Sequence, residues 1–121
     1  MSTFNVKKCT VRGMEYALIE SDGMVIDKVQ DGLDLMANAD SGKIILQDHQ
    51  VNPDFFRLRT GFAGELLQKF MNYGVSLAVI GDFSKYPGDT LRDFIRESNK
   101  NGRIVFAASQ DEALNLWNRA G

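Results

Sequence analysis

The feature that most constrains the fold is the stretch 52–82, where a long amphipathic segment runs directly into a short apolar one. Gly74 is a residue type that commonly ends helices, and residues 75–81 are apolar enough for a buried strand. The segment before Gly74 places apolar residues at helical spacing: Phe62, Ala63, Leu66, Leu67, Phe70 and Met71. The sequence therefore predicts a helix followed by a strand, with these side chains in the core.

Positions 52–54 carry three independent helix-start signals. Asn52 is a preferred N-cap residue, Pro53 suits the first helical position, and Asp54 complements the positive end of the helix dipole. Together they predict a helix that begins at Pro53. The sequence leaves open whether residues 53–73 form one helix or two, because a second start near Thr60 also fits the pattern.

The remaining segments alternate between strand and helix signals. Residues 4–11 and 14–20 are rich in β-formers around Arg12-Gly13, which predicts a hairpin. Asp27 with Gln30 has capping-box spacing and predicts a helix over about 28–39. The other predicted elements are strands at 43–46 and 103–108, a loop at 82–88, a third helix that contains Leu91, Phe94 and Ile95 and ends near Gly102, and a final helix with Ser109, Ala113, Leu114 and Trp117.

This order, β-β-α-β-α-β-α-β-α, fits the length of the chain. A chain of 121 residues is about one domain long and can bury one core without disulfides or metal. The sequence predicts one α/β domain over residues 1–121. Its single-layer, mixed and mostly parallel sheet would start with the hairpin and carry four helices, with right-handed crossovers between parallel strands.

Composition limits the partners and the compartment. The 14 Lys and Arg residues against 16 Asp and Glu give a formal charge of −2, which does not favour nucleic acid or an anionic membrane as a partner. Cys9 has no second cysteine to pair with and fits a reducing compartment. The N-terminal residues lack a signal-peptide core and the longest apolar run is too short to cross a bilayer. A cytoplasmic protein is predicted.

Polar residues follow the predicted parallel strands, at the position where α/β proteins bind ligands. The loops 47–52 and 82–88 and the region around Ser109 would meet at one rim of the sheet. A solvated polar rim without a ligand explains the same residues. The candidate site residues at or near this rim are Asp48, His49, Arg57, Arg59, Thr60, Gly61, Asp82, Ser84 and Lys85.

Arginines near a helix start are unusual, because a cation there opposes the helix dipole. If a helix begins near Thr60, its free N–H groups together with Arg57 and Arg59 would suit a phosphate or a carboxylate. If residues 53–73 form one long helix, the same arginines are simply exposed. The anion hypothesis depends on that break.

Catalytic and metal chemistry has little support in the sequence. His49 is the only histidine and Cys9 the only cysteine, so no structural zinc site can form within the chain. Aspartates such as Asp82 are common at strand ends, and Ser84 lacks the Gly-x-Ser-x-Gly elbow of a hydrolase. No cofactor is predicted. The enzymatic alternative is a small enzyme that uses His49 with Asp48 or Asp82 as acid and base.

Four runs of the sequence resemble a bacterial family of unknown function, the family numbered 4180. They are VQDGLDLMANA (29–39), NPDFFRLRTGFAGELLQKFMNY (52–73), IGDFSKY (80–86) and LRDFIRESN (91–99). The runs are spread over most of the chain. The resemblance implies membership of that family and brings no established activity.

The element order is also similar to that of anti-sigma-factor-antagonist (STAS) domains, which dock protein partners and sometimes bind small ligands. Those domains carry an Asp-Ser-Ser-Gly run whose first serine is phosphorylated. The corresponding run here is Leu58-Arg59-Thr60-Gly61, so Arg59 stands at the acceptor position. The resemblance therefore implies a docking surface at this position without a phosphoserine switch.

These observations favour a non-enzymatic regulatory module over an enzyme. We expect it to bind a protein partner or a small anionic ligand through residues 47–61 and 82–86. A docking module should show an exposed apolar patch beside Arg57, Arg59 and Lys85. Homodimerisation through residues 4–11 is a further hypothesis, because an unpaired edge strand invites pairing.

Overall fold

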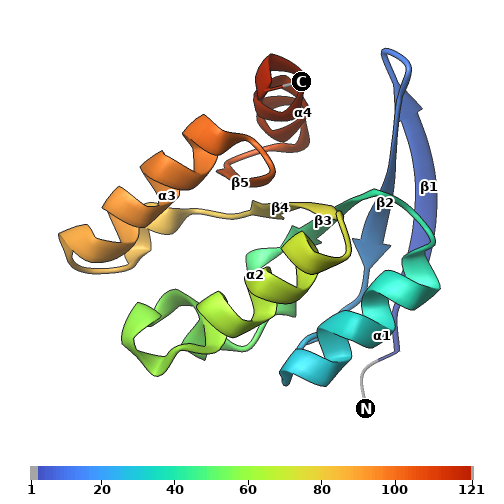
Figure 1. Cartoon of the computed structure of the whole chain (residues 1–121). Helices are drawn as coiled ribbons and strands as arrows, with labels where there is room; N and C mark the ends of the chain where they lie inside the picture. The colour runs from blue at the N-terminus through green and yellow to red at the C-terminus, as the bar shows by residue number, and fades with distance from the viewer. Residues whose placement is uncertain (1–2, 121) are drawn as a thin grey trace.

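The computed structural model describes residues 3–120 and contains one five-stranded sheet. The strands lie side by side in the order in which they occur in the chain, and only the first pair is antiparallel (Figure 1). They are β1 (Asn5–Val11), β2 (Met14–Glu20), β3 (Lys43–Gln47), β4 (Ser76–Ile80) and β5 (Ile104–Ala107). The predicted mixed, mostly parallel sheet is confirmed.

The β1–β2 hairpin forms where it was predicted. Its two-residue turn has positive φ at Arg12 (53°) and Gly13 (78°), the backbone of a type I′ turn, and Val11 pairs with Met14. This turn twists in the same sense as the strands that it joins. The hairpin leaves β1 at one edge of the sheet.

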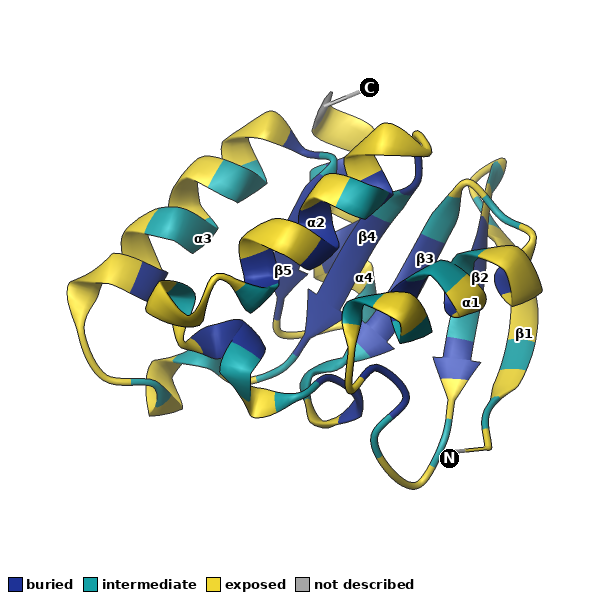
Figure 2. Cartoon of the chain, turned by 60° about the horizontal axis from the view of Figure 1, so that its bottom comes forward, coloured by how far each residue is buried: buried dark blue, intermediate teal, exposed yellow. Residues whose placement is uncertain are grey.

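Three helices cover one face of the sheet and one covers the other. The helices α1 (Val29–Ala39), α2 (Phe62–Asn72) and α3 (Asp89–Asn101) each connect neighbouring parallel strands, whereas α4 (Gln110–Ala120) follows the last strand. Right-handed crossovers between strands placed in sequence order put all connecting helices on the same face. The helix α4 lies behind the sheet (Figure 2).

Each face of the sheet has its own apolar core. On the first face, Leu35 of α1 and Leu66 and Phe70 of α2 are fully buried. On the second face, Trp117 of α4 packs with the residues of β2 to β5, and its indole N–H donates to the Arg103 carbonyl at 3.4 Å. The predicted apolar faces of α2, α3 and α4 therefore contact the sheet, with the exception of Met71.

The segment 53–73 is broken near Thr60, as one of the two expected forms required, but the part before the break is not an α-helix. Its first part is two 3₁₀ turns, Pro53–Phe56 and Leu58–Thr60, and the α-helix begins only at Phe62, after Gly61 in the left-handed region (φ 80°). Asn52 does cap the first turn, with its side chain accepting from the Asp54 N–H at 2.9 Å. The predicted helix start at Pro53 is therefore present, but as a 3₁₀ turn that ends at Phe56, because local capping signals specify a start and not a continuation.

Tertiary packing explains why the helix does not continue from Pro53. Phe55 and Phe56 are both buried. The Phe55 ring contacts Phe106 of β5, and the Phe56 ring contacts Tyr86 in the loop between β4 and α3. The Thr60 hydroxyl then donates to the Asp54 carbonyl at 2.9 Å and closes the double turn. Burial of two adjacent aromatic rings thus replaces the first part of the predicted helix.

Two smaller expectations also need correction. The side chain of Asp31, and not of Gln30, accepts the N–H groups of Asp27 and Lys28 and closes the start of α1. Met71, expected in the core, is 40% exposed because it lies at the edge of the buried face of α2, four residues after Leu67. The ends of the other elements agree with the predicted positions, including Gly74 and Gly102 in the left-handed region after α2 and α3.

Candidate functional site

The polar residues that follow β3 and β4 bind one another. The Lys85 ammonium donates to the Asp48 carboxylate at 2.8 Å, and this hydrogen bond raises the pKa of Lys85. The Asp48 side chain is only 14% exposed and packs against Gly81. A Cβ atom at Gly81 would lie 2.6 Å from the Asp48 Cγ, so a glycine is required there. The Asp48–Lys85 ion pair therefore links the loop after β3 to the loop after β4.

Asp82 is held within its own turn. Its carboxylate accepts from the Ser84 hydroxyl at 2.5 Å and from the Ser84 N–H at 3.1 Å, at the start of the 3₁₀ turn Phe83–Lys85. These two hydrogen bonds lower the pKa of Asp82, the side-chain bond more than the backbone one. Asp82 is therefore an ionised acceptor that stabilises the turn.

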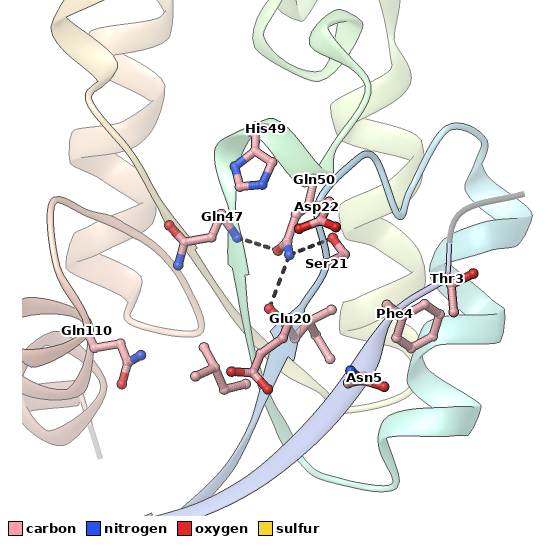
Figure 3. A pocket seen from close by; sticks show the side chains of 12 residues that line it. Thr3, Phe4, Asn5, Glu20, Ser21, Asp22, Gln47, His49, Gln50 and Gln110 are labelled. Carbon is pink, nitrogen blue, oxygen red and sulfur yellow. Dashed lines mark hydrogen bonds between the residues drawn. The ribbon is translucent and has the colours of Figure 1, made fainter.

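His49 lies in a different hollow. It is exposed and lines an open polar cavity beyond the ends of β2 and β3, together with Glu20 and Gln110 (Figure 3). Beside it the buried Gln50 connects the two strands, because its amide donates to the Ile19 carbonyl at 3.1 Å. Gln50 therefore has a structural role in this hollow, because it holds the ends of β2 and β3 together.

The predicted acid–base residues do not converge within residues 3–120. His49 makes no hydrogen bond to a carboxylate there, the Asp48 carboxylate is turned toward Lys85, and Asp82 lines a separate hollow beside β5. No group of three or more His, Cys, Asp or Glu side chains in this part of the chain is arranged to hold a metal ion. The predicted pairing of His49 with Asp48 or Asp82 is therefore not present in residues 3–120.

A third region combines apolar surface with two arginines. We call it the arginine cleft; it has a volume of about 620 Å³ and lies between the two 3₁₀ turns and the start of α3. It is lined by Pro53, Phe56, Arg57, Leu58, Arg59, Tyr86, Pro87, Thr90 and Leu91. Both prolines of the chain are among these residues. Two loops far apart in the sequence therefore form its walls.

Stacked aromatic rings form one side of the arginine cleft. The rings of Phe56 and Tyr86 stack with centroids 4.7 Å apart and an angle of 21° between their planes, and Phe83 packs against both. Burial raises the pKa of Tyr86, so its hydroxyl stays protonated at neutral pH. Lys85 lies over the same ring, 5.4 Å from the centroid. The aromatic wall thus joins the Asp48–Lys85 pair to the cleft.

The two arginines of the cleft are exposed and weakly paired. The Arg57 guanidinium is 3.6 Å from the Asp54 carboxylate, and both side chains are largely exposed, so this ion pair contributes little. Arg59 has no ion-pair partner in the part of the chain that the structure describes. Their guanidinium groups are therefore available to a ligand.

Thr60 ends the second 3₁₀ turn, Gly61 follows it, and neither residue lines the arginine cleft. The Thr60 hydroxyl accepts from the Phe62 N–H at 3.2 Å, which occupies one of the free donors at the start of α2. The two arginines and the start of α2 consequently do not line the same cavity. The anion hypothesis required both to face one ligand, and this arrangement is not present. The two 3₁₀ turns, Pro53–Phe56 and Leu58–Thr60, position the arginines.

The predicted binding surface, 47–61 with 82–86, contains Pro53, Phe56 and Tyr86, but none of them was among the candidate site residues. Phe56 was assigned to a helix and Tyr86 to a loop, and neither assignment predicts that their rings stack. One signal was present: each of the two prolines lies within three residues of an aromatic side chain in a predicted site segment. Proline fixes φ and favours rigid loop walls.

The fold and the cleft define a small α/β domain with a ligand-sized, arginine-flanked apolar cavity. A family model described as a domain of unknown function, DUF4180, matches residues 11–116, and the chain belongs to that family. No curated protein and no solved structure gives a significant match. None of the helices within residues 3–120 combines the length and the apolar character needed to span a membrane.

Proposed function

We propose that this protein is a non-enzymatic binding module whose arginine cleft holds a small carboxylate with an apolar body. The observation that carries the proposal is the placement of Arg57 and Arg59 beside the stacked rings of Phe56 and Tyr86. An apolar group would lie against the rings, and a carboxylate would accept from the guanidinium groups. Arginine suits this role because its planar donors match the two carboxylate oxygens.

The size and polarity of the cleft support a small ligand. Its volume of about 620 Å³ falls within the range of about 300–1,000 Å³ typical of small-molecule sites. Most of its lining is apolar, including Leu58, Pro87 and Leu91. Inorganic phosphate alone would leave this surface uncovered, so an anion with an apolar body is the better match.

A regulatory role in the bacterial cytoplasm is the wider form of this proposal. It is supported by the similarity of the element order to STAS domains, in which the corresponding surface docks partners. The acid–base alternative paired His49 with Asp48 or Asp82, and neither of these carboxylates lines the cavity of His49; the carboxylates that do are Glu20 and Asp22. The arginine cleft is the feature that supports the binding proposal.

Thermal unfolding with matched probes tests the proposal. The probes are octanoate, 4-phenylbutyrate, octanamide as the neutral counterpart, and inorganic phosphate. A carboxylate probe at about 100 times its dissociation constant should stabilise the protein by about 2.7 kcal/mol, which raises the melting temperature by several degrees. Octanamide and phosphate should raise it much less, because each supplies only one of the two interactions.

Two variants assign the effect to the cleft. Arg57→Gln with Arg59→Gln should abolish most of the shift produced by the carboxylates. Arg119→Gln changes an exposed arginine on α4, on the other face of the sheet, and should leave the shift unchanged. A shift that survives in the double variant, or no shift with either carboxylate, would overturn the proposal.

A further inference from the structure

A second cavity lies away from the arginine cleft, between α1 and the segments 40–42 and 73–75 that follow α1 and α2. We call it the α1–α2 groove; it has a volume of about 740 Å³ and its apolar lining includes Leu33, Met36 and Tyr73. The two helices are closely packed, since a Cβ atom at Gly32 would lie 2.4 Å from the Leu66 Cδ1. This close contact keeps α1, whose residues form one wall of the groove, next to α2 (Figure 2).

Tyr73 marks this groove as a surface for another molecule. Within residues 3–120, the large apolar side chains that remain exposed are Met71 at 40% and Tyr73 at 68%, both at the end of α2. Tyr73 also lines the groove. Exposed tyrosines beside apolar grooves are frequent anchors of protein interfaces, because they bury a large area with little loss of side-chain entropy.

The rim of the α1–α2 groove is acidic. Asp34 and Asp40 belong to its lining, which contains no lysine or arginine. Both helices end here, so their partial negative charges add to the two carboxylates, and α1 has no basic residue in its last turn. Three cations lie nearby and outside the lining: Lys8 reaches the Asp40 carbonyl, Lys69 is in the last turn of α2, and an Arg103 guanidinium nitrogen is 4.0 Å from the Cβ position of Gly74.

The acidic surface continues along the other side of α1. A neighbouring hollow shares Asp34 with the groove and adds Asp27 and Asp31, against the single cation Lys28. The outer surface of α1 therefore presents carboxylates next to apolar side chains over its whole length. Such a surface is complementary to a segment that carries lysine or arginine beside an apolar stripe.

We infer that the α1–α2 groove docks a cationic amphipathic helix of a partner protein. Its apolar stripe would contact Leu33, Met36 and Tyr73, while its lysines or arginines would reach Asp34 and Asp40. This is the helix-in-groove mode of recognition. This site is separate from the arginine cleft and does not depend on the function proposed for it.

A second copy of this chain is a poor occupant. The most regular basic residues on a helix are Arg92, Arg96 and Lys100 of α3, and each is already paired with an acidic residue three positions earlier. The apolar side chains of α3 are used in the core of its own chain. The cationic stripe must therefore come from a different protein.

Fluorescence anisotropy with three model peptides of about 14 residues, roughly four helical turns, tests this inference on the full chain. The first carries leucine at positions i, i+3, i+4 and i+7 with lysine elsewhere. The second contains the same residues in an order without an apolar stripe. The third replaces every lysine by glutamate. Binding is expected for the first peptide only.

Paired substitutions with the same change of charge locate the binding. Asp34→Asn with Asp40→Asn should weaken binding of the first peptide about tenfold, since close charge pairs at an interface are disrupted. Asparagine suits the left-handed backbone of Asp40 (φ 47°) and keeps the acceptor for Gln30 at position 34. Asp93→Asn with Asp111→Asn, on α3 and α4, should change it less than about twofold.

A third variant tests the apolar half of the interaction. Tyr73→Ser should weaken binding without lowering the melting temperature appreciably, because the side chain is 68% exposed. Equal binding of the first two peptides, equal weakening by both paired substitutions, or no binding of the first peptide would each overturn the inference. The first two results would indicate attraction by net charge alone.

Discussion

Polar residues at the strand ends and arginines in the cleft differ in what satisfies their charges. Asp48 is bonded to Lys85 at 2.8 Å and Asp82 to Ser84 at 2.5 Å, so these side chains stabilise the loops that carry them. Arg59 has no ion-pair partner within residues 3–120, although it was predicted in the same list of site residues.

The comparison separates polar groups that are already bonded within the fold from polar groups that are available to a ligand. A charged group that already has a partner would have to give up that bond before binding anything else. A guanidinium that extends over an apolar cavity gains from a new partner at little cost. Position at the carboxyl end of a strand is therefore weaker evidence for a binding site than an unused hydrogen-bonding group beside an apolar wall.

The largest expected effect concerns the packing at the strand ends. Gly81→Ala should lower the free energy of unfolding by about 1–3 kcal/mol, because the new methyl group would overlap the Asp48 side chain. Gly64→Ala is the matched control: nothing lies within 4 Å of its Cβ position on α2, and it should stabilise the helix by up to about 1 kcal/mol. Urea unfolding measures both. Equal effects of the two substitutions would contradict the close contact at Gly81.

An intermediate effect separates the paired from the unpaired charges. Asp48→Asn should lower the free energy of unfolding by about 1 kcal/mol at neutral pH, a value reduced because Lys85 is half exposed. Arg59→Gln should change it by less than about 0.5 kcal/mol. Chemical unfolding of both variants provides the measurement. A larger loss for Arg59→Gln would mean that this arginine has a structural role.

The smallest expected effect is a pH dependence in acid. Because the folded state lowers the pKa of Asp82, this carboxyl stabilises the fold at pH values above its unfolded pKa of about 3.9. The contribution is lost as the pH falls through the lowered folded pKa. Ser84→Ala removes the stronger of the two hydrogen bonds, so an NMR titration should find a higher Asp82 pKa in the variant. An unchanged pKa would show that this bond does not hold the carboxylate.

The sequence determined the sheet and most of its helices. The apolar runs around Ile45 and Ala78, the turn at Arg12-Gly13, and the N-cap at Ser109, which accepts from the Glu112 N–H, all act within a few residues. Signals of this range specify secondary structure almost independently of the rest of the chain.

Only the tertiary structure decided the double turn after Asn52, the arginine cleft and the α1–α2 groove. Phe56 stacks on Tyr86, 30 positions later, and Tyr73 lines the same groove as Asp40, more than 30 positions earlier. Contacts of this kind depend on which distant side chains the sheet brings together. Local propensity is worth a few tenths of a kcal/mol per residue, and burial of an aromatic ring outweighs it.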